Sequence, residues 1–135
     1  MSIILFLAAA AAPIDYDKLE VPDPIPPALR GSWEETAKEC RNEYSTTRLV
    51  VGANWVAYYE AYGLMQISTH AGIPDTDESL SIRFAMAGES STWDNELVFA
   101  WNKSKSDELI LIEAKTPENM ERERTRVRYV RCLEL

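Results

Sequence analysis

The sequence predicts an all-β protein in which an antiparallel up-and-down meander closes into a small barrel of seven or eight strands. The first observation is an apolar alternation of period two, which is typical of strands with one buried face. In the clearest run, every second residue is apolar, namely Leu80, Ile82, Phe84 and Met86. The second observation is that clusters of turn residues separate such runs. Short connections favour a closed barrel, because closure removes the exposed strand edges of an open sheet.

The expected strands follow one another along the chain. After a first strand near Leu29, they cover residues 48–51, 54–62, 64–70, 79–86, 93–101, 108–115 and 124–133. Turns or loops are expected at residues 52–53, 63, 72–77, 88–91 and 103–107, which are rich in glycine and polar residues. Residues 34–44 are compatible with one short helix. The prediction is therefore a single β-barrel domain over residues 29–135.

The N-terminal segment predicts export. Eleven of the residues 1–12 are apolar, and this run is shorter than the roughly 20 residues that cross a bilayer as a helix. It is typical of the apolar part of a signal peptide, with cleavage expected after Ala10 or Ala11. Because the run contains no Lys or Arg, a membrane-retained anchor and a buried first strand are the alternatives. Residues 13–28 are rich in proline, so we expect an extended tether there.

Composition excludes several classes of function. The chain has 135 residues and a formal net charge of −8, which argues against the basic surface that a nucleic-acid binder needs. Two cysteines and one histidine are too few for a zinc finger, and they make a histidine-based metal site implausible. We therefore predict no metal, no other cofactor and no nucleic-acid partner.

The two cysteines are expected to form a disulfide. Cys40 and Cys132 lie near opposite ends of the predicted domain, and an exported protein meets an oxidising environment. The bridge would join the region after the first strand to the last strand, and a loop of this length stabilises a fold by roughly 4 kcal/mol. A redox or free-thiol role is the alternative.

Several short motifs resemble a group of small uncharacterised exported proteins of alphaproteobacteria. The motifs are Leu29-x-Gly31-x-Trp33, Tyr58-Tyr59-Glu60, Gly88-Glu89, Thr92-Trp93 and Tyr129-x-Arg131-Cys132. The Gly-x-Trp opening is also similar to lipocalin-like (calycin-type) barrels and to periplasmic inhibitors of secreted metalloproteases, although those inhibitors have their second cysteine midway along the chain. The resemblance implies that Trp33 plugs one end of the barrel beside Arg131.

Five residues are candidates for a ligand-binding site. They are Tyr59, Glu60, Arg83, Trp93 and Trp101. Two registers are open for the segment around Glu60. If Tyr59 faces the core, Glu60 faces solvent, whereas the other register buries Glu60 and requires a partner such as Arg83 or Arg131.

Alternating arginines mark the last predicted strand. Arg124, Arg126 and Arg128 recur at every second position, which places them on one face of a strand. They could pair with acidic residues of neighbouring segments, Glu113, Glu108 or Glu34. Alternatively, they form a basic stripe that binds an anionic ligand or partner.

The sequence favours a non-enzymatic binding module that holds a small apolar or amphipathic molecule. The alternative is an envelope protein that binds or inhibits another protein. No set of catalytic residues can be read from the spacing of titratable side chains. We expect a monomer that is periplasmic or secreted and has no transmembrane span in its mature form.

Overall fold

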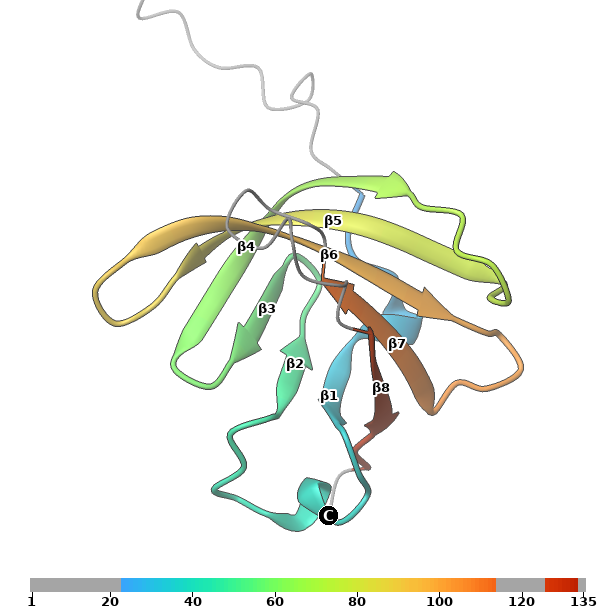
Figure 1. Cartoon of the computed structure of the whole chain (residues 1–135), viewed down its shortest axis with the longest axis horizontal. Coiled ribbons are helices and arrows are strands. Elements are labelled where there is room, and N and C mark those ends of the chain that lie inside the picture. Colours follow the sequence, from blue (N-terminus) through green and yellow to red (C-terminus); the bar gives the residue numbers. More distant parts are fainter. Residues whose placement is uncertain (1–22, 114–125, 134–135) are drawn as a thin grey trace, which may run out of the picture.

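A computed structural model describes residues 23–113 and 126–133, which form eight antiparallel strands in a closed barrel (Figure 1). The strands are β1 Gly31–Glu34, β2 Leu49–Val51, β3 Trp55–Tyr58, β4 Ala61–His70, β5 Glu78–Ala87, β6 Thr92–Trp101, β7 Glu108–Glu113 and β8 Arg126–Arg131. Each strand pairs with the next, and β8 pairs with β1 through Trp33↔Arg131 and Glu34↔Val130. The predicted meander and its closure are confirmed. The predicted signal peptide 1–12 and residues 13–22 of the predicted tether lie outside the described residues.

The expected strand 54–62 is wrong as a single element. β3 ends at Tyr58, Tyr59 and Glu60 form a turn, and β4 begins at Ala61. Glu60 has a φ of 59°, the left-handed conformation that a tight turn requires. Gly63, expected in a turn, is instead a buried strand residue. A Cβ there would lie 2.3 Å from the sulfur of Met86, so the glycine makes room for that side chain.

The short helix expected at 34–44 is present only as one 3-10 turn, η3, Glu39–Arg41. Glu34 belongs to β1, and the long connection from β1 to β2 carries η3. A second 3-10 turn, η2, Pro27–Leu29, precedes β1. Among the described residues, no helix is long and apolar enough to cross a membrane.

Seven of the eight strands, all but β4, contribute fully buried apolar side chains to the core of the barrel. Phe84 and Phe99 meet edge to face, with ring centroids 6.4 Å apart. The buried core consists of Ile25, Leu29, Trp33, Leu49, Val51, Val56, Ile82, Phe84, Met86, Leu97, Phe99, Leu109, Leu111 and Tyr129. Ile25 lies within the segment predicted as a tether, yet its side chain is 1% exposed and its backbone N–H donates to the carbonyl of Ala53 at 2.7 Å.

One end of the barrel is closed by the segment that precedes β1. The indole N–H of Trp33 donates to the carbonyl of Leu29 at 2.8 Å, and the guanidinium of Arg131 lies 4.3 Å from the centre of the Trp33 ring. Arg131 also donates to the carbonyl of Ala28, within η2, and to that of Arg30, which follows η2. This arginine therefore holds the turn against the tryptophan through both cation–π and hydrogen-bond contacts.

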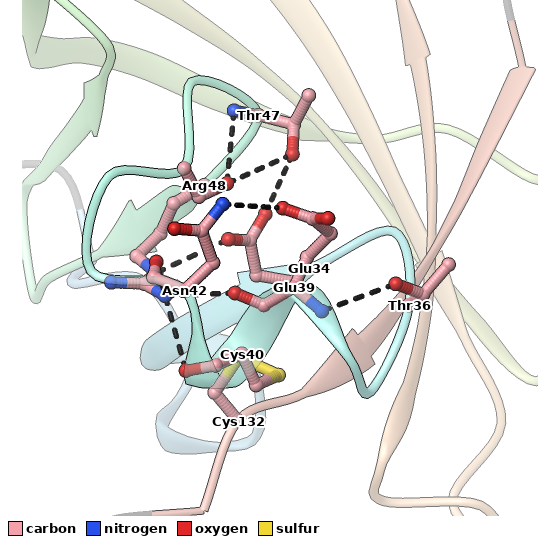
Figure 2. Close-up of a disulfide and its surroundings, with 9 residues drawn as sticks. Glu34, Thr36, Glu39, Cys40, Asn42, Thr47, Arg48 and Cys132 are labelled. Carbon is pink, nitrogen blue, oxygen red and sulfur yellow. Dashed lines mark hydrogen bonds and ion pairs between the residues drawn. A yellow bond between two sulfur atoms is a disulfide. The ribbon is translucent and has the colours of Figure 1, made fainter.

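The predicted disulfide is confirmed. Cys40 of η3 is bonded to Cys132, which follows β8, across a separation of 92 residues (Figure 2). The N–H of Cys132 donates to the carbonyl of Ser32, so the bridge fixes η3 beside β1. An intramolecular disulfide is consistent with an extracytoplasmic location.

Candidate functional site

A cavity opens at the end of the barrel opposite the Trp33 plug. Its volume is about 330 Å³. It is lined by Tyr58, Ala61, Met86, Trp93, Asn95, Leu97, Leu111, Val127 and Tyr129. Because consecutive strands are antiparallel, this end of the barrel holds the last residues of β3, β5 and β7 and the first residues of β4, β6 and β8. Figure 1 shows the β3–β4 and β5–β6 turns together, away from η2 and the β6–β7 turn.

Strand alternation explains why these side chains converge. On β6, Trp93, Asn95 and Leu97 are alternate residues and point to the inside of the barrel, while Asp94 and Glu96 point outward. The same alternation turns Val127 and Tyr129 of β8 inward. The cavity is therefore a continuation of the core toward the barrel mouth.

The chemistry of the cavity is mostly apolar, with a few hydrogen-bonding groups. Tyr58 and Tyr129 contribute hydroxyl groups, and Asn95 contributes a side-chain amide. Among the described residues, none of the lining side chains is charged. Such a surface suits a ligand with an apolar body and one or two neutral polar groups.

Tyr129 is held in its neutral form. Burial raises the pKa of its hydroxyl above the ordinary value of 10.0, and the negative charges of Glu35 and Glu34 raise it further. The phenol therefore remains a hydrogen-bond donor at neutral pH. The same carboxylates make the potential at this side of the cavity unfavourable for a negatively charged ligand.

The five predicted ligand-binding residues are not brought together. Trp93 lines the cavity, whereas Trp101 lies at the opposite end of β6. Tyr59 and Glu60 are exposed in the β3–β4 turn, and Arg83 is exposed on β5.

β3 follows the register that turns Tyr58 inward, but Glu60 lies in the turn after the strand and is exposed. Val56 is buried and Tyr58 lines the cavity, so these residues face inward, while Trp55 is exposed and Glu60 lies beyond the strand. The sequence reasoning therefore missed Tyr58, and it also missed Tyr129 as a cavity residue. The alternation of Tyr129 with the arginines of β8 was the signal that could have identified it.

The arginine pattern of β8 is retained in the part of the chain that the structure describes. Arg126 and Arg128 are exposed, whereas Val127 and Tyr129 face the cavity. Arg124 lies outside the described residues. Two acidic residues proposed as partners for the arginines pair with other bases: Glu34 lies 3.4 Å from Arg48, and Glu108 lies 3.9 Å from Lys105.

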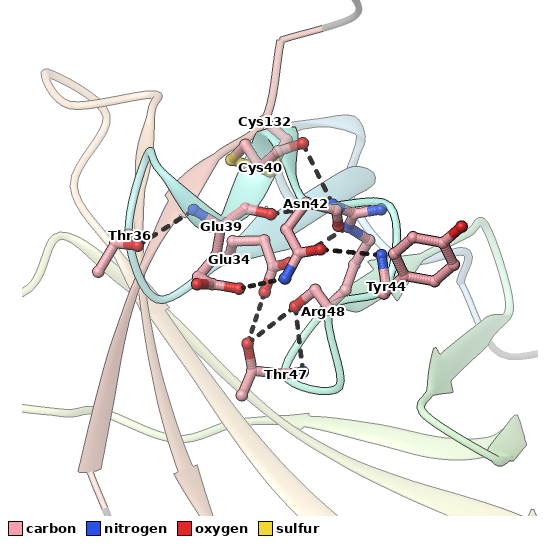
Figure 3. A network of polar contacts seen from close by, with 10 residues as sticks. Glu34, Thr36, Glu39, Cys40, Asn42, Tyr44, Thr47, Arg48 and Cys132 are labelled. Atoms are coloured by element: carbon pink, nitrogen blue, oxygen red, sulfur yellow. Dashed lines mark hydrogen bonds and ion pairs between the residues drawn. A yellow bond between two sulfur atoms is a disulfide. The ribbon is translucent and has the colours of Figure 1, made fainter.

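A buried polar network lies beneath the disulfide loop (Figure 3). Glu34 is 0% exposed, and one of its carboxylate oxygens accepts from the Thr47 hydroxyl at 2.8 Å. Its other oxygen lies 3.4 Å from Nε of Arg48. The same guanidinium donates to the carbonyls of Glu39, Cys40 and Asn42. Glu34 Oε2 and Arg48 Nε face each other without a hydrogen bond, whereas the other contacts tie η3 to Arg48 and Glu34 to Thr47. The network therefore holds η3 in place and does not constitute an open site.

The fold and the cavity define a disulfide-linked antiparallel barrel with one plugged end and one apolar mouth. No protein-family profile matches the chain, and neither a curated protein nor a solved structure is significantly similar to it. The function must therefore be argued from the site itself.

Proposed function

We propose that this protein is a non-enzymatic binding module that takes a small, uncharged amphipathic molecule into the barrel mouth. The observation that carries the proposal is the cavity of about 330 Å³ with apolar walls and the polar groups of Tyr58, Asn95 and Tyr129. At about 30 Å³ for each water-sized group, this space holds roughly eleven non-hydrogen atoms. It is near the lower limit of pockets that bind small molecules.

The lining favours a neutral ligand over a carboxylate. A carboxylate that enters the cavity loses its hydration and meets no cation among the described lining residues. Glu35 and Glu34 add repulsion near Tyr129. A hydroxyl or amide group, by contrast, can exchange hydrogen bonds with Asn95 and with the Tyr129 hydroxyl.

The test compares ligands that share an alkyl chain and differ in their head group. We expect 1-decanol to raise the melting temperature and to change tryptophan fluorescence, because Trp93 lines the cavity. Decanoate is expected to bind about tenfold more weakly at neutral pH, because its charge must be desolvated.

Matched variants locate the binding. Val127→Trp fills the cavity and should abolish decanol binding, whereas Leu64→Trp introduces the same side chain on the exposed face of β4 and should leave decanol binding unchanged. Failure of decanol to bind the folded wild-type chain would contradict the proposed function. Equal losses in both variants would show that the alcohol does not bind in the cavity.

We further propose that the protein is a lipocalin-like barrel related to the small exported proteins of alphaproteobacteria, and that it is periplasmic or secreted. The Trp33–Arg131 contact at the plugged end and the Cys40–Cys132 bridge support this assignment. Expression of the full chain in a bacterium, followed by fractionation and N-terminal sequencing, tests export. We expect a mature chain that begins after Ala10 or Ala11 in the envelope or the medium, and uncleaved chain in the cytosol would contradict it.

A further inference from the structure

A second hollow lies on the outer face of the barrel, separate from the cavity. This groove has a volume of about 340 Å³. Its floor includes Ala100 of β6 and Ile110 of β7, which are paired in the sheet. Arg126 and Arg128 of β8 border one side, and Pro74 of the β4–β5 loop borders the other.

The loop wall of the groove is preformed. The β4–β5 loop folds back over β5, where the Ser79 hydroxyl accepts from the N–H of Ile73 at 3.1 Å. The Thr76 hydroxyl donates to the carbonyl of Ile73 at 2.7 Å, and the N–H of Asp77 donates to the side chain of Asn102 at 2.8 Å. Because these hydrogen bonds fix the loop on both sides, a ligand binds to a preformed groove, and the loop does not lose conformational freedom on binding.

The arginine side of the groove carries two positive charges that are not paired with any carboxylate in the described part of the chain. Arg126 and Arg128 are exposed, and no described carboxylate forms an ion pair with either of them. Lys105 is already paired with Glu108, and Asp75 lies in the loop wall on the other side. In a chain with a net charge of −8, this pair of arginines is a local site of opposite sign.

The spacing of the arginines restricts what can bind. Side chains two residues apart on a strand are separated by roughly 7 Å and project from the same face. An extended peptide has the same repeat, so acidic residues at alternate positions can face both arginines at once. Across the groove floor the strands are already paired, Ala100 with Ile110 and Ile110 with Arg128, so recognition over this floor uses side chains.

We propose that this groove docks an extended acidic segment of a partner protein, with carboxylates at alternate positions facing Arg126 and Arg128. The partly exposed Ile110 of the floor contacts the methylene groups of the acidic side chains. This interaction goes beyond ligand binding in the mouth, because it uses the opposite face of β8 and none of the charged groups near the cavity.

The experiment uses the full chain and two fluorescent peptides of identical composition. One peptide carries glutamates at alternate positions, and the other carries them at adjacent positions. We expect the alternating peptide to bind more tightly in a fluorescence anisotropy titration, and its affinity to fall as salt is raised. The double variant R126Q/R128Q should weaken its binding by about tenfold.

Control variants separate specific docking from general charge attraction. Arg41→Gln removes an exposed positive charge from η3 and should leave the affinity unchanged. Far-UV circular dichroism and the melting temperature establish that R126Q/R128Q is folded. Equal affinity for the two peptides, an equal loss in R41Q, or no binding to the wild-type chain would each overturn the proposal.

Discussion

The two ends of this barrel use the same kind of residue in different ways. At the closed end, Trp33 is 1% exposed, its N–H donates to the carbonyl of Leu29, and the guanidinium of Arg131 lies on its ring. At the mouth, Trp93 is 41% exposed and lines a cavity. The difference lies in what covers each tryptophan: the 25–30 segment packs on the first, and solvent reaches the second. We therefore expect Trp33 to contribute more to stability than Trp93, while the mouth leaves space for a ligand.

Replacing each tryptophan by alanine gives the largest expected contrast. Trp33→Ala should lower the free energy of unfolding by about 3–5 kcal/mol, because it removes a fully buried ring and the surface on which Arg131 lies. Trp93→Ala should cost only about 1 kcal/mol, since its ring is partly exposed. Urea unfolding measures both values. Similar losses at the two positions would contradict the proposed division between the ends.

Removing the disulfide tests how far the closed end depends on its covalent link. The Cys40→Ser/Cys132→Ser variant should lose about 2–4 kcal/mol of unfolding free energy, because the unfolded chain regains the freedom of a long loop. Decanol affinity of the folded fraction should remain unchanged, because neither cysteine lines the cavity. Thermal melting of the oxidised wild type with and without reductant provides an independent measurement, and identical curves with verified reduction would refute the prediction.

The buried carboxylate beside the disulfide should have a smaller effect. Glu34→Gln keeps the shape of the side chain and removes the charge that faces Arg48. We expect a loss of about 1–2 kcal/mol, since the carboxylate is buried but Arg48 is partly exposed. Urea unfolding of the variant, compared with the exposed control Glu43→Gln, measures the effect. Equal behaviour of the two variants would mean that the ion pair contributes nothing to stability.

A single methyl group at the mouth should affect ligand binding more than stability. Gly63→Ala places a Cβ 2.3 Å from the present position of the Met86 sulfur, so the flexible methionine must move. We expect a cost of about 1 kcal/mol in stability and a clear loss of decanol affinity, because Met86 lines the cavity. Titration of the variant with decanol checks this expectation. Unchanged affinity would indicate that Met86 moves away from the cavity.

The smallest expected effect is a pH dependence that arises from Tyr129. Because its pKa is raised in the folded state, the native protein retains the phenolic proton more strongly than the unfolded chain does. This contribution to stability is present below pH 10.0 and is lost as pH rises from there through the folded pKa. In Tyr129→Phe, the free energy of unfolding should therefore fall less steeply above pH 10.0. Parallel urea titrations of the two proteins between neutral and alkaline pH measure the difference, and identical slopes would contradict it.

The alternation of apolar residues was sufficient to predict the barrel, since a strand with one buried face has apolar residues at every second position. The same alternation placed Arg126 and Val127 on opposite faces of β8. The alternation could not locate the β3–β4 turn, because the turn contains neither glycine nor proline. Tyr59 and Glu60 form it instead through a positive φ at Glu60. Nor could it show that Gly63 serves packing, because that role depends on Met86 of a different strand. The cavity residues Tyr58 and Tyr129 depended in the same way on which strands become neighbours.

The contacts of Arg131 also have a consequence for how the chain folds. Its guanidinium binds the carbonyl of Arg30 across a sequence separation of 101 residues, and β8 completes the sheet by pairing with β1. Contacts between such distant segments carry a large loop-closure entropy and slow the formation of a fold. During synthesis, β1 emerges from the ribosome long before its partner strand exists. The barrel therefore cannot close until β8 has been made, and any folding before that stage leaves the edge of β1 that pairs with β8 unpaired.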